Sequence, residues 1–324
     1  MNSEIEFDNI IDAINNANKI AIFTHISPDG DAIGSSLSMY LILKEMKKEV
    51  DVITDEYSRC FKFLPGLENI KKETNENYDL AIALDCATKP RLYDPNNTFD
   101  NTITTINIDH HASNTYFAKY NYVEGNSPAA CKTLIKFFKR LGITITKEIG
   151  TCLMAGIITD TGGFRYNTVD DETFEFAAQM LDLGVNISDI YYRTFDVKTK
   201  PQFMLSSIAT SRLNFYSKDR IAVTYVTQDD FKDVDASVGD HEGIVNIGRN
   251  IEGVEVSIFL REVEPSFYRV SLRSNDIVDV SEVASKFDGG GHTKAAGCDI
   301  HYDLETSIKK LVRETNKYLW MGFY

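Results

Sequence analysis

The chain has 324 residues, of which 43% are hydrophobic, and this is enough for two ordinary globular domains with separate cores. Its formal net charge of −14 argues against binding of long duplex nucleic acid, because proteins that bind a duplex normally present a basic face. No apolar run approaches the ~20 residues of a membrane span, and the acidic start MNSEIEFDNI is unlike a secretion signal. We therefore expect a cytoplasmic protein that does not bind a membrane.

Short apolar segments alternate with amphipathic ones in the first half of the chain, as in a parallel α/β sheet. Buried strands are predicted at 19–25, 50–54, 78–85 and 102–109, and an amphipathic helix is predicted over 33–48. Three more helices are predicted to follow the capping residues Ser127, Thr146 and Asp170. Gly142 and Gly184 are expected to end the first and the last of these three.

The pattern changes after the first 186 residues. Residues 187–214 are mixed and helical without a strand, and we interpret them as a linker. Strand-like segments then follow at 221–227, 254–262 and 268–274, and helices are predicted over about 280–287 and 303–319. The sequence thus predicts an N-terminal parallel-sheet domain (1–186), a helical linker (187–214) and a smaller C-terminal α+β domain (215–324).

Carboxylates and imidazoles gather where the predicted strands of the first domain end. Ligands of an open parallel sheet bind outside the carboxyl ends of its strands. Eight candidate groups are expected at this edge: His25, Asp29, Asp31, Asp85, Asp109, His110, His111 and Asp160. Mixed carboxylate and imidazole ligands suit two divalent cations such as manganese, iron or zinc better than calcium.

Each of these groups also has a simpler interpretation when it is taken alone. The segment SPDGD around Asp29 is typical of a turn, and TDTGG after Asp160 is similar. An aspartate at a strand end, such as Asp85, commonly caps a turn. The adjacent pair His110 and His111 is harder to explain in this way, since the chain has six histidines in all. The joint occurrence of the groups at converging strand ends favours a metal site.

Taken together, these residues resemble the four motifs of the DHH phosphoesterase superfamily. The motifs are His25-x-x-x-Asp29-x-Asp31, the strand-end Asp85, the triplet Asp109-His110-His111 and the later Asp160. In the second half, VSLRSN (270–275) and FDGGGHTKAAG (287–297) resemble the DHH-associated C-terminal domain, although Asp288 stands where many members have another glycine. The order and coverage are most similar to the short NrnA-type branch.

The resemblance implies a two-metal site with manganese as the expected ion. It assigns His25 and Asp29 to one metal, a second set to the other, and Asp85 to a bridging position. The second set comprises Asp31, His110 and Asp160. Two ions ~3.5–4 Å apart clamp the attacking and leaving oxygens of a phosphoryl group and make a nucleophile available at neutral pH.

Catalytic roles are implied for Asp85 and also for Asp109 and His111. We expect Asp109 to orient an imidazole, and His111 to act near the phosphate on the side of the leaving group.

The second domain is expected to bind the substrate, with the active site in a cleft between the two domains. Backbone N–H groups of Gly289, Gly290 and Gly291 can approach an anion closely, and His292 adds a side-chain donor. Arg273 can hold a phosphate through two parallel hydrogen bonds, with Ser274 beside it. A run of glycines can also be no more than a flexible turn. Arg91 is a further candidate at the cleft, and a plain surface arginine is the alternative.

The implied activity is that of a phosphoesterase, a hydrolase acting on ester bonds. Short oligoribonucleotides such as nanoRNA or pApA would give mononucleotides, and pAp would give AMP and phosphate, as for a 3′(2′),5′-bisphosphate nucleotidase. A cyclic di-AMP phosphodiesterase is the alternative enzyme, and a catalytically silent nucleotide-binding protein is the alternative of another class. The sequence lacks the features of the family's pyrophosphatases and long-strand exonucleases. A homodimer is the default expectation for such an enzyme.

Overall fold

The computed structural model describes residues 3–321, and the chain divides into two compact units, Met1–Val197 and Lys198–Tyr324. The linker expected at 187–214 is shared between them. Its first part forms α7 (Ile187–Tyr191) and the π-helical turn η4 (Tyr192–Asp196) of the first unit. Its second part forms α8 (Lys200–Ser211) of the second unit.

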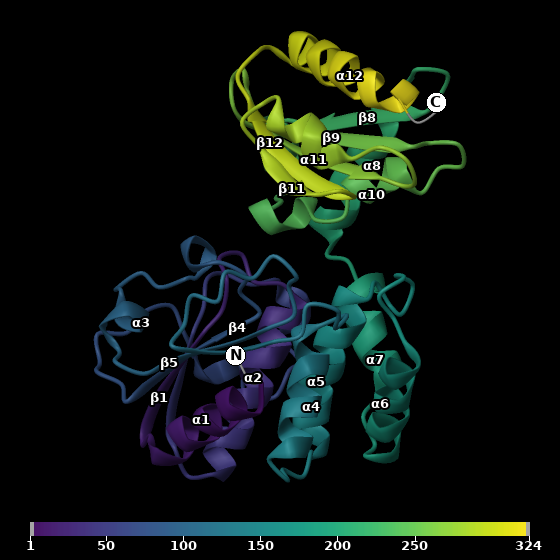
Figure 1. The fold of residues 1–324 in the computed structure, drawn as a ribbon. Helices are drawn as coiled ribbons and strands as arrows, with labels where there is room; N and C mark the ends of the chain where they lie inside the picture. Colours follow the sequence, from purple (N-terminus) through teal and green to yellow (C-terminus); the bar gives the residue numbers. More distant parts are fainter. Residues whose placement is uncertain (1–2, 322–324) are drawn as a thin grey trace. The chain divides into compact units, whose positions relative to one another are not determined.

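The first unit is built on a six-stranded sheet in the order β3-β2-β1-β4-β5-β6, in which all neighbours are parallel. Figure 1 labels three of these strands, β1, β4 and β5. The strands are β1 (Lys19–Phe23), β2 (Glu49–Ile53), β3 (Ile70–Lys71), β4 (Leu80–Leu84), β5 (Thr105–Asp109) and β6 (Tyr120–Val123). The chain runs outward in both directions from the centre, so the strand order reverses between β1 and β4. At such a reversal the loops leave on opposite faces of the sheet and open a crevice beyond the strand ends.

Helices cover the sheet of the first unit and enclose its main core. They are α1 (Ser3–Asn16), α2 (Gly30–Glu45), α4 (Ala130–Arg140), α5 (Lys147–Asp160) and α6 (Asp171–Asp182). The cluster that they form with the sheet includes Ile20 and Ile22 of β1, whereas Ala21 and Phe23 face a smaller cluster on the other side with α3 (Thr98–Asn101). The predicted parallel α/β fold is confirmed.

Two of the three predicted helix caps are confirmed. The side chain of Thr146 accepts a hydrogen bond from the amide of Ile149, and that of Asp170 accepts one from Thr173. The third prediction is wrong: α4 begins at Ala130, and Ser127 does not cap it. The carboxylate of Asp31 accepts hydrogen bonds from the amides of Ala130 (2.5 Å) and Cys131 (2.9 Å) instead. A group about 100 residues earlier in the chain therefore caps this helix.

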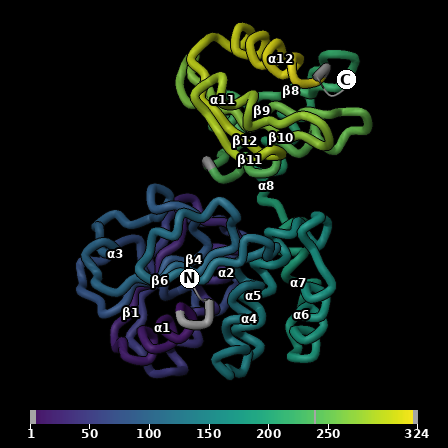
Figure 2. Tube along the Cα trace, in the orientation of Figure 1, coloured from purple at the N-terminus to yellow at the C-terminus, as the bar shows by residue number. Residues whose placement is uncertain are grey.

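The second unit has its own six-stranded sheet, in the order β11-β12-β10-β9-β8-β7 (Figure 2). The strands are β7 (Asn214–Tyr216), β8 (Ile221–Val226), β9 (Val256–Glu264), β10 (Phe267–Ser274), β11 (Gly290–His292) and β12 (Ala295–Ile300). Neighbours are antiparallel except for β8 and β9. The helices α11 (Val280–Ser285) and α12 (Leu304–Met321) cover the core face, and α8 and α10 (Val245–Arg249) pack on the other. This confirms the predicted α+β unit.

The short elements that remain lie in the connections. They are η1 (Arg59–Phe61), η2 (Leu67–Asn69), η3 (Lys89–Arg91), α9 (Gln228–Asp233) and η5 (Val238–His241). Within residues 3–321, no helix combines the length and the apolar character needed to cross a bilayer.

Candidate metal centre

The charged side chains predicted for the site converge at the reversal point of the first sheet. His25 follows β1, Asp85 follows β4, and Asp109 to His111 end β5 or follow it. Asp29 and Asp31 stand at the start of α2, and Asp160 is the last residue of α5. Asp31 and Asp85 are almost completely buried. Strand ends and helix ends from five elements thus bring several acids into one confined space.

One group of donors is formed by His25, Asp29 and Asp85, whose ligand atoms lie within 4.8 Å of one another. Nε2 of His25 is 3.6 Å from Oδ2 of Asp85 and 3.9 Å from Oδ1 of Asp29. Asp29 also caps α2, because its Oδ1 accepts hydrogen bonds from the amides of Asp31 and Ala32. Asp29 therefore has both roles considered for the SPDGD segment: it stabilises the local backbone, and it belongs to a group of possible metal ligands.

A second group is formed by Asp31, His110 and Asp160, again within 4.8 Å. Nε2 of His110 is 3.4 Å from Oδ2 of Asp160 and 3.8 Å from Oδ2 of Asp31. The same nitrogen is 3.4 Å from Oδ1 of Asp85. Asp85 therefore contacts both groups, with one oxygen toward His25 and the other toward His110.

Backbone carbonyls fix the orientation of both imidazoles. Nδ1 of His25 lies 2.9 Å from the carbonyl oxygen of Ile26, and Nδ1 of His110 lies 3.0 Å from that of Ser127. A carbonyl oxygen only accepts, so each Nδ1 carries the proton and each Nε2 faces the carboxylates. Hydrogen bonding of the remote ring nitrogen in this way is the usual arrangement of a metal-binding histidine.

Asp85 has two features that fit a cation. Its φ is +52°, a left-handed conformation that is uncommon for side chains other than glycine and that concentrates at functional sites. Its Oδ1 is buried and has no hydrogen-bond partner among residues 3–321. A buried carboxylate oxygen without a donor is costly unless a cation or a water satisfies it. The donor set, rich in carboxylates with two imidazoles, fits a pair of first-row divalent cations.

His111 is bound differently from His110. Its Nδ1 lies 2.8 Å from Oδ1 of Asp109, which is fully buried, and its side chain is part-exposed. Because a carboxylate accepts, the proton of this hydrogen bond is on Nδ1, and Nε2 of His111 is not used in the contact with Asp109. The imidazole that Asp109 contacts is that of His111, and the orienting role of Asp109 stays a prediction.

Close packing of α2 on α5 sets the spacing between Asp31 and Asp160. A methyl group on Gly34 of α2 would lie 2.4 Å from the carbonyl oxygen of Cys152 in α5. A methyl group on Gly156 of α5 would lie 2.6 Å from Oδ1 of Asp31. The two helices approach this closely because both residues lack a side chain.

The residues predicted to bind substrate lie on the second sheet. Arg273 and Ser274 end β10, and Gly290 to His292 form the edge strand β11. Ser274 is buried, and its hydroxyl donates to the carbonyl of Thr293 (3.3 Å). Arg273 Nη1 donates to the carbonyl of Leu272 (2.9 Å).

Packing explains two of the three glycines. A side chain on Gly289 would lie 2.3 Å from the carbonyl oxygen of Gly297 on β12, and one on Gly291 would lie 2.5 Å from that of Ala295. A side chain on Gly290 would meet no atom within 4 Å. Of these three glycines, Gly290 is the one whose small size is not required by the packing around it.

Arg91 belongs to the first unit and is exposed. Its carbonyl accepts a hydrogen bond from the amide of Ile26 (2.8 Å), and the next residue, Leu92, pairs with His25 in an isolated β-bridge. The backbone at Arg91 thus lies beside the loop that follows β1. Its part in substrate binding stays a prediction.

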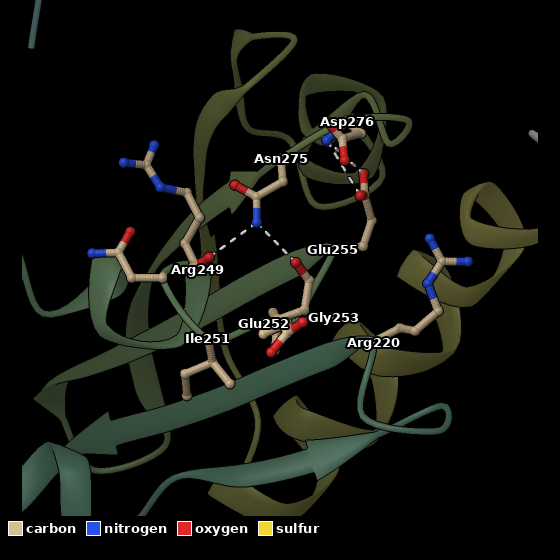
Figure 3. A pocket seen from close by; sticks show the side chains of 10 residues that line it. Arg220, Arg249, Ile251, Glu252, Gly253, Glu255, Asn275 and Asp276 are labelled. Atoms are coloured by element: carbon tan, nitrogen blue, oxygen red, sulfur yellow. Dashed lines mark hydrogen bonds between the residues drawn. The ribbon is translucent and has the colours of Figure 1, made fainter. Parts of the chain in front are cut away.

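A polar pocket of about 510 Å³ lies in the second unit, lined by Arg220, residues 249–255, Asn275 and Asp276 (Figure 3). Asn275, the last residue of VSLRSN, donates from its amide to the carbonyls of Arg249 (2.9 Å) and Val254 (2.8 Å). The carboxylate of Glu255 accepts hydrogen bonds from the amides of Asp276, Ile277 and Val278. These contacts hold the chain that leaves β10, so the end of this motif has a structural role.

Comparison with known proteins assigns the family. Residues 19–157 match the DHH family N-terminal domain, and residues 218–320 match the DHHA1 domain. A bifunctional oligoribonuclease and PAP phosphatase NrnA from Thermus thermophilus is 32% identical over 309 residues, covering 94% of this chain and 91% of that protein. The chain belongs to the DHH family.

Solved structures share the architecture of this DHH protein. An exopolyphosphatase-related protein from Bacteroides fragilis is 28% identical, with a TM-score of 0.91, and the match covers 97% of this chain and 96% of that one. RecJ from Thermus thermophilus, solved in complex with Mn²⁺, is 13% identical with a TM-score of 0.57, and the match covers 98% of this chain and 54% of RecJ. The RecJ likeness shows a common fold.

Sequence reasoning missed Asn114 of the DHH unit. Its side-chain amide donates to Oδ2 of Asp109 (2.6 Å) and to Oδ1 of Asn107 (2.8 Å), and all three residues are buried. Its own Oδ1 accepts from the amide of Tyr116 (2.6 Å). Asn114 thus fixes the carboxylate that holds His111. In the sequence, the signal that could have identified Asn114 was its position three residues after His111, the last residue of the DHH triplet.

Crowding shifts the proton affinities of the DHH site strongly. Burial, and then the charge of Asp85, raises the pKa of Asp31 to about 7. Burial, and then the charge of Asp31, raises the pKa of Asp160 to about 9. Burial alone would lower the pKa values of the two imidazoles, but the nearby carboxylate of Asp85 raises that of His25 to about 9 and that of His110 to about 11.

Asp85 itself stays ionised. Its burial favours the neutral acid, but the imidazoles of His110 and His25 outweigh this effect and hold its pKa well below the ordinary value. The site thus combines an ionised Asp85 with two carboxyl groups, Asp31 and Asp160, whose pKa values are raised by burial and by neighbouring charges.

Proposed function

We propose that this DHH-family chain is a metal-dependent phosphoesterase whose site holds two divalent cations, with Mn²⁺ as the preferred ion. The observation that carries the proposal is that Asp85 links two separate donor groups through its two oxygens. The first group, His25 and Asp29, would hold one ion, and the second would hold the other. The second group comprises Asp31, His110 and Asp160.

When bound, such a pair of ions polarises a phosphoryl group and lowers the pKa of water to the neutral range. The residues of this chain position the reacting groups. Asp85 keeps its charge at neutral pH and can neutralise both ions at once. Asp31 is held by the amides of Ala130 and Cys131, so it needs no rearrangement to accept a cation.

His111 is proposed to act as the general acid. Asp109 orients the ring and raises its pKa against the effect of burial, which favours the protonated imidazole. A proton at Nε2 can be given to a leaving oxygen on the substrate. Asn114 supports this arrangement through its bond to Asp109.

The proposed substrates are short oligoribonucleotides and pAp, as the name of the Thermus thermophilus relative states for that protein. The net charge of −14 is consistent with short substrates, because a long polyanion would be repelled. Cyclic di-AMP hydrolysis remains the alternative within the same chemistry. A cytoplasmic location and a homodimer stay predictions.

A substrate panel tests the proposed function. The purified full chain with Mn²⁺ is incubated separately with pAp, pApA, a five-residue RNA, cyclic di-AMP and pyrophosphate, and products are separated by chromatography. We expect turnover of pAp and the RNA. Faster turnover of cyclic di-AMP than of pApA would favour the alternative, and no turnover of any phosphoester would refute the proposal.

Cation affinity should rise with pH. The ion-free site retains protons on Asp31, Asp160 and His25 near neutral pH, and a cation must displace them. Raising the pH removes these protons in advance, so we expect Mn²⁺ to bind at least about tenfold more tightly for each unit between pH 6 and 8. Titration calorimetry in two buffers of different ionisation enthalpy measures both the affinity and the proton release. Affinity that is constant over this range would contradict the assignment.

Gly290 offers a test of the second unit, for which we propose that Arg273, Ser274, the glycine strand and His292 contact substrate phosphate. Gly290→Ala adds a methyl group in open space, so the thermal unfolding temperature should be unchanged. If substrate approaches the backbone here, KM for pAp should rise roughly tenfold, a loss of about 1.4 kcal/mol of binding. Gly239→Ala is the matched control, because its added methyl group also meets no neighbour. Equal KM values for the two variants would exclude Gly290 from the binding surface.

A further inference from the structure

Two arginines lie directly opposite each other on the sheet of the second unit. The register of β9 and β10 pairs Arg261 with Arg269. Like charges that face each other across neighbouring strands are destabilising. A sheet that pairs them therefore loses stability unless an anion lies between them.

Among residues 3–321, the sheet register places one carboxylate, that of Asp299, opposite this pair. Asp299 is opposite Arg269 on β12, but its Oδ1 is 3.9 Å from Nε of Arg269, and both side chains are largely exposed. Arg261 is only part-exposed. Burial and the charge of Arg269 lower its pKa, whereas Asp299 raises it. Two guanidinium groups and one carboxylate leave a local positive charge on a chain whose net charge is −14.

This pair is on the same face of the sheet as Arg273 and His292. Successive residues of a strand alternate between faces, so Arg269 and Arg273 share a face, opposite the buried Val270 and Leu272. Arg273 and His292 are both paired with Ala295, which places them in one row across the sheet. The row of Arg269 is four residues further along β10, about 13 Å away at ~3.3 Å per residue.

Small residues separate the two rows. Ser271 on β10 is opposite Gly297 on β12, and Gly297 is opposite Gly290 on β11. On the β9 side Ser271 is opposite Phe259, which is buried under α8 and α10. A chain that lies along β10 and β12 would therefore cross glycine and serine between the row of Arg269 and the row of Arg273. This spacing suits a polyanion with more than one phosphate.

We propose that Arg261 and Arg269 form a subsite for a second phosphate of an oligoribonucleotide, beyond the phosphate held near Arg273 and His292. The subsite rests on the proposed function of the second unit and adds to it a preference for RNA of several residues over pAp. Two planar guanidinium groups can hold one phosphate through several charge-assisted hydrogen bonds.

The test compares the double variant R261Q/R269Q with the natural chain. We expect the ratio of KM for a five-residue RNA to KM for pAp to rise roughly tenfold. Removal of the like-charge pair should leave the thermal unfolding temperature unchanged or raise it. Lys309→Gln is the matched control, because this exposed lysine is on α12, which covers the opposite face of the sheet.

Direct binding separates this inference from the proposed function. The Kd of a labelled five-residue RNA is measured on full-length chains that also carry Asp85→Asn, as a function of salt concentration. Loss of one phosphate contact should lower the slope of log Kd against log salt by about 0.7. An unchanged slope and an unchanged Kd would overturn the subsite, even if the natural chain hydrolyses RNA. A natural chain without turnover would refute the proposed function, while the binding comparison would still decide the subsite.

Discussion

Replacement of Asp85 with asparagine should lower kcat/KM for pAp and for short RNA more than about 100-fold. Loss of a residue that only supports a metal ligand typically costs 10–100-fold, and Asp85 contacts both donor groups itself. Asparagine removes the charge but keeps the shape, and it tolerates the left-handed backbone at this position. The protein should therefore remain folded while the activity is lost.

Initial rates over a range of substrate and Mn²⁺ concentrations measure the effect of Asp85→Asn, and circular dichroism checks the fold. Asp100→Asn is a suitable control, since Asp100 is an exposed carboxylate that pairs with Lys89. The control should have the activity of the natural chain. Activity of Asp85→Asn within tenfold of the natural chain would contradict a bridging role for this carboxylate.

Gly34→Ala should destabilise the first unit and also impair the metal centre. The added methyl group would lie 2.4 Å from the backbone oxygen of Cys152, so α2 and α5 must move apart. Overpacking of this kind typically costs 1–3 kcal/mol. For a unit of this size, at about 2–4 °C per kcal/mol, we expect the unfolding temperature to fall by roughly 2–12 °C.

Movement of these helices also separates Asp31, carried by α2, from Asp160, carried by α5. We therefore expect weaker Mn²⁺ binding as well, measured by titration calorimetry at a temperature where the variant is folded. Gly239→Ala controls for the general effect of replacing a glycine. If Gly34→Ala unfolded at the same temperature as the natural chain, the close contact between α2 and α5 would not be required for stability.

Much of the fold could be predicted from the sequence because its strands are buried and apolar. The segments that contain β1, β4 and β5 read as strands, and a parallel sheet brings their ends together. The caps Thr146 and Asp170 act within four residues, so local sequence was sufficient. The cap of α4 could not be read in this way, since Asp31 reaches it from about 100 residues away.

Other features depended on tertiary contacts that no local pattern contains. A flexible turn was one interpretation of the glycine run, and Gly290 to His292 instead pair with β12 and form a strand. The role of Asn114 follows only from the meeting of its side chain with Asp109 and Asn107. The donor groups were suggested by family resemblance, whereas the link through both oxygens of Asp85 required atomic positions.

The most direct test of the central claim is anomalous diffraction from crystals of the full chain grown with Mn²⁺. The account predicts two manganese peaks per chain, one at His25 and Asp29 and one at the second donor group, with Asp85 between them. The second donor group is Asp31, His110 and Asp160. No peak at these residues, or a single ion that engages one group alone at saturating Mn²⁺, would contradict it.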